Sequence, residues 1–300
     1  MSTFVLLTIT GFGLGAMYFL IASGLSLIYG LMGVLNFAHG LFLTVGAYGT
    51  WRVETELTGI GSVTLRYVLA AAIGLAIGAA FATLVELILI RPLYRRHIEQ
   101  VLVTVGLSIA GVALVQAIWG QDDRPFVTPR WMNDTTTVLG AHVPNDRWVE
   151  IVAGAAVLVL LETFLRRTRY GLIVRAGVEN RAMVTALGID VRRAFTLVFA
   201  IGGIAAALAG ALSNVYFGNV TPDRGTSLLI FAFIVVVIGG LGSLTGSALA
   251  AVLVGLTQQY ANYYGDQSLN LGSSIGDITV VLLLGGILLI RPQGLSGRFA

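Results

Sequence analysis

Long apolar stretches alternate with short polar segments along this 300-residue chain. Windows of about 18 or more residues that are almost free of charge are typical of transmembrane helices. Such windows cover Phe4–Ile28, Tyr67–Ile90, Val101–Trp119, Val149–Leu165, Ala194–Phe217 and Leu228–Tyr260, and a shorter one covers Ile278–Ile290. The pattern predicts an all-α protein, a polytopic transmembrane helical bundle of about 8 to 9 membrane segments that forms a single domain over residues 1–300.

The window from Leu228 to Tyr260 is long enough for two membrane segments. Its glycine-rich sequence GGLGSLTG, residues 239–246, predicts a turn between them. This sequence lacks the lysine of a phosphate-binding loop, so we expect that the chain does not hydrolyse ATP. We therefore expect no catalytic residues and no cofactor.

The first 51 residues carry no formal charge and are long enough for two helices. We expect a helix break near Ser23–Gly24 and a second helix over Leu25–Trp51. At about 1.5 Å per residue, this second helix crosses a hydrocarbon core of about 30 Å. Asn36 and His39 would then lie near the middle of the membrane.

Glycines on either side of Asn36 and His39 weaken this second helix. Gly33 and Gly40 flank the pair, so we predict an interrupted helix near residues 30–40. At interrupted membrane helices, freed backbone groups and helix ends can bind polar ligands. These four residues are therefore candidates for a substrate pathway. The alternative is a turn near the cytoplasmic surface in which His39 is solvated.

Composition supports the membrane interpretation and excludes several kinds of site. Hydrophobic residues make up 56% of the chain and charged residues 11%, whereas soluble proteins carry about 25% charged residues. The chain has no cysteine and its three histidines are far apart, so we expect no disulfide and no metal site. No basic cluster indicates nucleic acid binding. The first apolar window is too long for a cleavable signal peptide, so we expect none.

Arginine divides the polar segments into two groups. The first group holds twelve arginines: Arg91, Arg95, Arg96, Arg166, Arg167, Arg169, Arg175, Arg181, Arg192, Arg193, Arg291 and Arg298. The second group holds six, mixed with acidic residues: Arg52, Arg66, Arg124, Arg130, Arg147 and Arg224. Cytoplasmic segments are enriched in basic residues, so we expect the first group in the cytoplasm. This places the N-terminus outside and the C-terminus in the cytoplasm.

Three segments resemble the signatures of one family, the branched-chain amino acid permeases of bacterial ABC importers. They are ASGLSLIYGLMGVLNFAHGLFLTVGAY (22–48), GLIVRAGVENRAMVTALGIDVRRAFTLVFAIGGIAAALAGAL (171–212) and VVIGGLGSLTGSALAAVLVG (236–255). They follow the family's order and spacing, and they resemble its "H" subunit more than its longer "M" subunit. The resemblance implies a permease domain in the bacterial inner membrane. It would import branched-chain or related hydrophobic amino acids with ATP hydrolysed by partner subunits.

The resemblance also implies partners. These are a second permease subunit, identical or different, two cytoplasmic ATP-binding subunits, an extracytoplasmic substrate-binding protein and membrane lipid. Permeases for urea and short-chain amides have nearly the same signatures and stay open as alternatives, as does a sugar permease of the same importer group. An ion-coupled secondary transporter is a further alternative, and it would need a buried acidic or ion-binding site.

Residues 166–194 form the longest cytoplasmic segment in this interpretation. Part of it has the spacing of an apolar stripe on one side of a helix. The stripe consists of Ala182, Met183, Ala186 and Leu187. We expect Gly188 to end this helix and Asp190 to cap the next one.

The sequence AMVTALG, residues 182–188, is similar to the loop through which many ABC permeases contact their ATPase, although Arg181 stands where glutamate is common. The segment is therefore a candidate for coupling to the ATPase. Its candidate residues are Arg175, Glu179, Arg181, Ala182, Ala186 and Gly188. The alternative is a helix that lies on the lipid surface with Arg175 and Arg181 facing phosphate groups.

Residues 120–148 form a polar segment on the predicted outer side, and this segment is long for a simple connection. Its charged residues are candidates for docking a substrate-binding protein. They are Asp122, Asp123, Arg124 and Arg130. A solvated loop without a partner is the alternative.

Three acidic residues lie within or next to the apolar windows. We expect Glu86 to pair with Arg91 and Glu162 to pair with Arg166, close to the membrane surface. Asp277 precedes the final apolar stretch, where we expect it to cap a helix.

Overall fold

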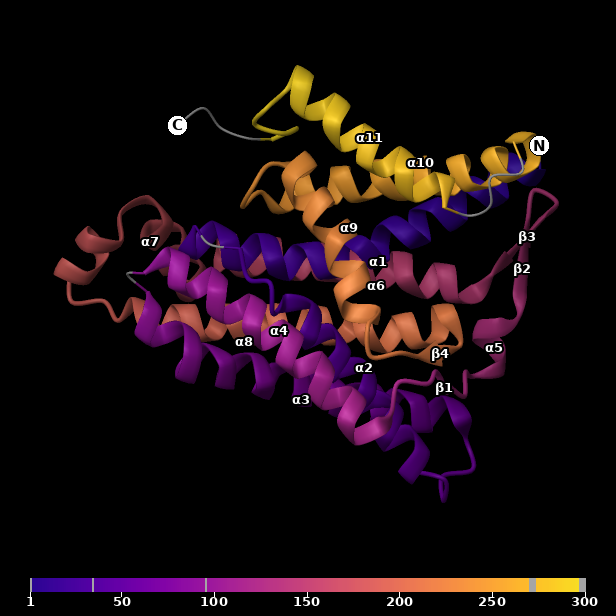
Figure 1. Ribbon diagram of the computed structural model, residues 1–300, viewed down its shortest axis with the longest axis horizontal. Helices are drawn as coiled ribbons and strands as arrows, with labels where there is room; N and C mark the ends of the chain where they lie inside the picture. The colour runs from indigo at the N-terminus through magenta and orange to yellow at the C-terminus, as the bar shows by residue number, and fades with distance from the viewer. Residues whose placement is uncertain (1, 34, 95, 270–273, 297–300) are drawn as a thin grey trace.

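The computed structural model describes residues 2–33, 35–94, 96–269 and 274–296, of which residues 31–32, 178–182 and 267–269 are described by their backbone alone. The helices are α1 (Ser2–Met32), α2 (His39–Glu56), α3 (Val63–Val85), the π-helix η1 (Glu86–Ile90), the 3₁₀-helix η2 (Arg91–Leu93), α4 (His97–Trp119), α5 (Arg130–Asn133), α6 (Asn145–Arg167), α7 (Arg169–Ala186), α8 (Val191–Phe217), α9 (Arg224–Gly239), α10 (Leu244–Leu269) and α11 (Ile275–Ile290). The strands are β1 (Arg124–Pro125), β2 (Thr135–Val138), β3 (Ala141–Pro144) and β4 (Asn219–Val220). The predicted helical bundle is confirmed (Figure 1).

Among the described residues, five helical segments are long and apolar enough to cross a membrane: Ser2–Gly30, Val63–Leu93, His97–Trp119, Asn145–Arg167 and Val191–Phe217. α9 and α10 pass the same test together but are bent by 120° at the turn between them, where GGLGSLTG predicted one. α11 is apolar but shorter. A polytopic membrane protein is confirmed, whereas the number of about 8 to 9 membrane segments stays a prediction.

α1 is one continuous helix, so the expected break near Ser23–Gly24 is wrong. Gly24 has a packing role instead. A methyl group on it would lie 2.8 Å from Cε1 of His39 and 2.9 Å from the carbonyl oxygen of Gly202. The missing side chain lets α2 and α8 approach α1 without ending the helix. The break comes later, between α1 and α2, within the predicted region of residues 30–40.

Small residues bring the helices of the bundle into close contact. A methyl group on Gly15 of α1 would lie 2.7 Å from the carbonyl oxygen of Ala251 in α10. One on Gly74 of α3 would lie 3.0 Å from the carbonyl oxygen of Gly46 in α2. In lipid, apolar side chains gain little from leaving the solvent, so close backbone packing contributes much of the stability of helix association.

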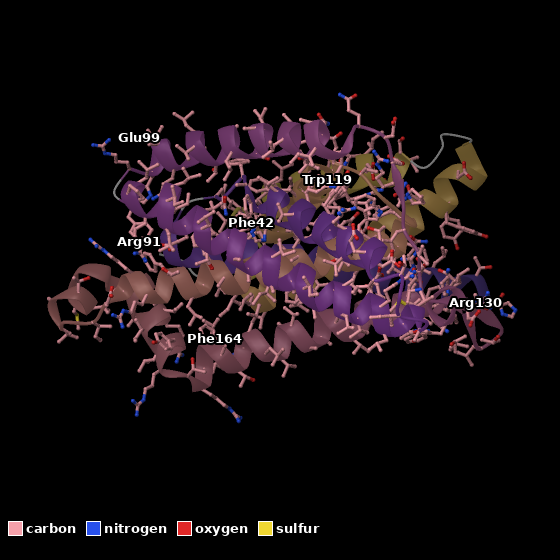
Figure 2. The ribbon with its side chains drawn as sticks, turned by 90° about the horizontal axis from the view of Figure 1, so that it is seen from below. Phe42, Arg91, Glu99, Trp119, Arg130 and Phe164 are labelled. Atoms are coloured by element: carbon pink, nitrogen blue, oxygen red, sulfur yellow. The ribbon has the colours of Figure 1, made fainter. Side chains whose placement is uncertain are left out.

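The long helices lie side by side between two ends that differ in structure (Figure 1). α7 lies at one end, and the β2–β3 hairpin lies at the other, where α1 begins. In Figure 2, Arg91 and Glu99 lie toward the α7 end, Trp119 and Arg130 lie toward the hairpin end, and Phe42 lies between them. This arrangement agrees with the two groups of polar segments that the arginine pattern separated.

The segment 120–148 contains a β-hairpin that the sequence did not lead us to expect. β2 and β3 pair antiparallel from Thr135 opposite Pro144 to Val138 opposite Ala141. The turn uses two left-handed residues, Leu139 (φ 48°) and Gly140 (φ 80°). Two strands of four residues are too short to give a clear alternating pattern in the sequence.

The segment after α11 closes over the turn between α9 and α10. Leu295 N donates a hydrogen bond to the carbonyl oxygen of Ile238 (2.7 Å), and Ser296 N donates one to that of Gly239 (3.1 Å). Carbonyl groups in the last turn of a helix find no N–H donor within the helix. The C-terminal segment supplies these donors to two carbonyl groups at the end of α9.

Candidate functional site

The chain turns between α1 and α2 around Asn36. Gly33 ends α1 with a φ of +65°, which glycine adopts without strain. Oδ1 of Asn36 accepts a hydrogen bond from Ala38 N (3.1 Å), and the carbonyl oxygen of Asn36 accepts one from His39 N (3.1 Å). These bonds hold the start of α2, where no side chain caps the helix directly.

The side-chain amide of Asn36 has one atom without a partner. A backbone N–H can only donate, so the atom facing Ala38 N is the oxygen and the other is Nδ2. Asn36 is 4% exposed, and its Nδ2 is buried without a hydrogen-bond partner among the described residues. A buried donor without an acceptor costs about 1–3 kcal/mol.

His39, at the first position of α2, faces α1. It is fully buried, and its Nε2 lies 3.1 Å from the carbonyl oxygen of Ile21. Its ring packs against Gly24, which lies eight residues before the end of α1, about 12 Å along the helix. α2 therefore begins inside the bundle, in agreement with the place of Phe42 in Figure 2. The surface-turn interpretation requires a solvated His39, whereas the side chain is buried.

A second short helix begins beside the first. α9 follows the non-helical segment after α8, and its Gly225 lies against Gly40 of α2. A methyl group on Gly40 would lie 2.6 Å from the carbonyl oxygen of Gly225. Oγ1 of Thr44 lies 3.4 Å from the carbonyl oxygen of Pro222 and can donate to it. The N–H groups of a first helical turn lack intrahelical acceptors and carry partial positive charge, so two such ends meet here.

A cavity of about 300 Å³ adjoins these two helix starts. Its walls come from α1, the segment before α2, α4 and α9. The lining residues are Leu25, Leu35, Asn36, Phe37, Val105, Ser108, Ile109, Thr226, Leu229, Ile230 and Phe233. A mainly apolar wall with a few polar groups is typical of small-molecule sites. A separate space of about 10 Å³ touches Asn36, Gln100 and Thr104, and it has room for about one water molecule.

The four residues expected in the pathway belong to one break but face different ways. Asn36 lines the cavity, His39 contacts α1, Gly33 forms the turn and Gly40 contacts α9. Sequence reasoning missed the residues that α4 and α9 contribute. One signal could have located Thr226. It follows the polar segment NVTPDRG, residues 219–225, which interrupts an apolar stretch as the segment around Asn36 does.

The residues considered for docking a binding protein gather at the hairpin end. Asp122, Asp123 and Arg130 are exposed. Asp123 accepts a hydrogen bond from Nδ2 of Asn219 (2.7 Å), and Arg124 pairs with Val220 across β1 and β4. The segment 120–148 is thus tied to the break before α9.

The residues considered for coupling lie on or just after α7. Arg175 and Ala186 are exposed, and so are the apolar Met183 (61%) and Leu187 (68%). Gly188 has a φ of +78° and donates to the carbonyl oxygen of Thr185 (3.0 Å), as a C-terminal cap does. The predicted cap at Asp190 is confirmed, since it accepts from Arg192 N (3.1 Å). The side chains of Glu179, Arg181 and Ala182 lie outside the described residues.

Buried charge gathers where α3 ends. Glu86 is fully buried, and its Oε1 lies 3.4 Å from Nε of Arg91, as predicted. It also accepts from Thr196 Oγ1 (2.8 Å) and from the hydroxyl of Tyr94. Burial, together with the hydrogen bond to Glu86, raises the pKa of Tyr94, so the phenol stays protonated and donates. The cluster joins α3 to α8.

Two other acidic residues were considered. Glu162 pairs with Arg166 at 2.6 Å, as predicted. Asp277 does not cap α11, whose N-cap is Ser274; it lies in the first turn and accepts from Nε2 of Gln258 (2.7 Å). Gln258 in turn accepts from the hydroxyl of Tyr18 (2.6 Å), so this chain of hydrogen bonds joins α11, α10 and α1. Among the described residues, no group of three or more His, Cys, Asp or Glu could hold a metal ion.

A multi-pass bundle with two broken segments beside a mainly apolar cavity that has a few polar groups is typical of membrane transport proteins. The family model described as "Branched-chain amino acid transport system / permease component" matches residues 7–290, and the chain belongs to this family. The resemblance seen in three segments is therefore confirmed over nearly the whole chain.

Two relatives have almost the same length as this chain. LivH of Salmonella typhimurium, a high-affinity branched-chain amino acid transport system permease protein, is 28% identical over 294 residues, which cover 96% of this chain and 94% of LivH. BraD of Pseudomonas aeruginosa, which has the same description, is 30% identical over 300 residues, with coverage of 97% and 94%. A solved structure, PsaBC from Streptococcus pneumoniae in complex with Fab, has a TM-score of 0.46 at 13% identity and covers 94% of this chain and 89% of its own.

Proposed function

We propose that this chain is a membrane-spanning permease subunit of an ATP-binding-cassette importer and that it carries branched-chain or related hydrophobic amino acids into the cell. The observation that carries the proposal is the match to the permease family over residues 7–290. The names of LivH and BraD, which describe permease proteins of branched-chain amino acid transport systems, support the substrate class.

The energy comes from partner subunits in this proposal. The chain contains no lysine, which the phosphate-binding loop of an ATPase requires. The complete importer would contain a second permease subunit, two ATP-binding subunits and a substrate-binding protein. In the bacterial inner membrane, the α7 end would face the cytoplasm and the hairpin end would face outward. This orientation follows because α7 lies in the arginine-rich segment 166–194, which the arginine pattern assigns to the cytoplasm.

The substrate pathway would pass the break that contains Gly33, Asn36, His39 and Gly40. Asn36 supports this because it lines the cavity and has a buried donor without a partner. His39 would act as a positioning residue, since it fixes the start of α2 against α1. The cavity is bordered by exposed apolar residues such as Ile109 and Ile230, which a second permease subunit would cover.

The coupling surface would be the exposed part of α7. Met183 and Leu187 expose apolar area at the end of α7, the helix that also carries the exposed Arg175, and a groove of an ATPase could cover such a surface. Glu179, Arg181, Ala182, Ala186 and Gly188 belong to the same proposed surface. At the opposite end, Asp122, Asp123, Arg124 and Arg130 would meet the substrate-binding protein through charge complementarity.

Uptake by reconstituted vesicles tests this function. The permease pair, its ATPases and the binding protein are placed in proteoliposomes, and uptake of radiolabelled leucine is measured with ATP inside and the binding protein outside. We expect uptake to require every component. Uptake by this chain alone, driven by a proton or sodium gradient, would assign it to the secondary transporters. Uptake of urea or a short-chain amide in preference to leucine would assign it to those importers.

A further inference from the structure

The N-terminal end of α9 borders the cavity. The first hydrogen bond of the regular helical kind comes from Ser227 N to the carbonyl oxygen of Asp223 (3.0 Å). The N–H groups of Gly225 and Thr226 precede it, and the N-cap residue Asp223 makes no side-chain hydrogen bond to them. Thr226 lines the cavity. Free N–H groups at a helix start favour an anion such as a carboxylate.

Asn36 supplies an independent sign of a ligand at the same cavity. Its Oδ1 accepts the hydrogen bond from Ala38 N. Its Nδ2 is therefore the atom of this side chain that can donate to a ligand. This atom is buried and unpartnered among the described residues, although the side chain lines the cavity. A carboxylate accepts several hydrogen bonds and would satisfy both Asn36 and the start of α9.

The rest of the cavity wall suits an aliphatic group. Leu25 of α1 and Leu229 and Phe233 of α9 line it, and no acidic residue is among the described lining residues. A carboxylate beside Thr226 would therefore meet no like charge from the lining residues, and Asp223, the N-cap of α9, is not one of them. Ser108 of α4 adds a hydroxyl group that can accept a hydrogen bond from an ammonium group.

We infer, on the basis of the proposed function, that this cavity is a subsite that binds the transported amino acid within the permease itself. The carboxylate lies between the start of α9 and the amide of Asn36, and the aliphatic side chain lies against Leu25, Leu229 and Phe233. The permease would thus select the substrate a second time after the binding protein has released it.

Photo-crosslinking locates the subsite directly. The reconstituted importer is supplied with photo-leucine, a leucine analogue with a diazirine in its side chain, and is illuminated; labelled peptides are then identified by mass spectrometry. We expect label on Leu25, Leu229 or Phe233 and its loss when excess leucine is present. Label confined to other segments, in an importer that takes up leucine, overturns the subsite but leaves the proposed function intact. If the wild-type importer takes up no leucine, both are overturned.

A comparison of leucine and valine uptake tests the position of the substrate side chain. Leu229→Trp narrows the cavity, so leucine uptake should fall about tenfold more than valine uptake. Leu249→Trp is the control, because Leu249 lies on α10, is exposed and does not line the cavity. An equal loss of leucine and valine uptake in Leu229→Trp, at equal amounts of assembled importer, overturns the placement of the side chain.

Two substitutions of Thr226, one charged and one neutral, test the position of the substrate carboxylate. Thr226→Glu puts a carboxylate in the first turn of α9, where the helix tolerates an anion but the substrate carboxylate would be repelled. Thr226→Gln has the same size and no charge. We expect the KM for leucine to rise about tenfold more in the glutamate variant than in the glutamine variant. An equal KM in the two variants overturns the placement of the carboxylate.

Discussion

Gly40 of α2 and Gly225 of α9 touch through their backbones, although 184 residues lie between them in the chain. Each is the second residue of a helix that begins inside the bundle. A methyl group on Gly40 would lie 2.6 Å from the carbonyl oxygen of Gly225, and one on Gly225 would overlap the carbonyl oxygen of Gly40. The distance between the two helix starts is therefore set by the absence of side chains at both positions.

Gly225→Ala should disturb this contact. The added methyl group would overlap the carbonyl group of Gly40 and the hydroxyl oxygen of Thr44. The carbonyl group belongs to the backbone and cannot turn aside, so α2 and α9 must separate, at a cost of about 1–3 kcal/mol. We expect a lower melting temperature of the purified complex and lower leucine uptake. Gly285→Ala is the control, because a methyl group there meets nothing within 4 Å. Equal melting temperatures for the two variants would show that the contact between α2 and α9 can relax freely.

The acceptor oxygen and the donor nitrogen of the Asn36 side chain can be tested separately. Asn36→Leu removes both the acceptor for Ala38 N and the free donor, so it should lower stability by about 1–3 kcal/mol and abolish uptake. Asn36→Ser keeps an oxygen that can accept from Ala38 N and loses the amide donor. We expect the serine variant to melt close to the wild type and yet to transport leucine poorly. Wild-type transport by this variant would rule out the amide donor.

Gly188 has a backbone conformation that a β-branched residue avoids. Gly188→Val should therefore distort the end of α7 and lower the amount of leucine imported per ATP hydrolysed by the complex. Gly177→Ala, also on α7, is the control, because its methyl group would lie an ordinary 3.5 Å from Cγ1 of Val191. An unchanged ratio of transport to hydrolysis in Gly188→Val would count against a coupling role for this segment.

Glu86 and Glu162 should respond differently to the same substitution. Glu86→Gln removes the buried charge that binds Arg91, Tyr94 and Thr196, and we expect a loss of about 2 kcal/mol in stability. Glu162→Gln breaks a partly exposed pair within one helix, and the loss should stay under about 1 kcal/mol. Thermal unfolding in detergent measures both. Similar losses would mean that the Glu86 cluster contributes no more than a surface pair.

Much of the fold could be predicted because membrane helices and their breaks leave local signals. The apolar windows located the long helices, and GGLGSLTG located the turn before α10. Gly188 located the end of α7, and Asp190 located the start of α8. Gly24 led to the wrong prediction of a helix break. In a sequence, a glycine that breaks a helix cannot be distinguished from a glycine that lets another helix approach. Only the position of His39 and Gly202 distinguishes them.

The candidate site could be predicted only in part. Asn36 was visible as a polar residue in an apolar stretch. Ser108 and Thr226 were not, because their relation to Asn36 depends on how α4 and α9 pack beside the break. Contacts between residues so far apart in the chain leave no periodic pattern in one sequence.

The hydrogen bonds from Leu295 and Ser296 to α9 have a consequence for the order of assembly. While the ribosome is still adding α10 and α11, the carbonyl groups of Ile238 and Gly239 have not yet met these partners. The nascent protein must therefore keep the end of α9 hydrated, or shielded by the insertion machinery, until two further helices have been made. The end of α9 is therefore completed only by residues that are synthesised after α11.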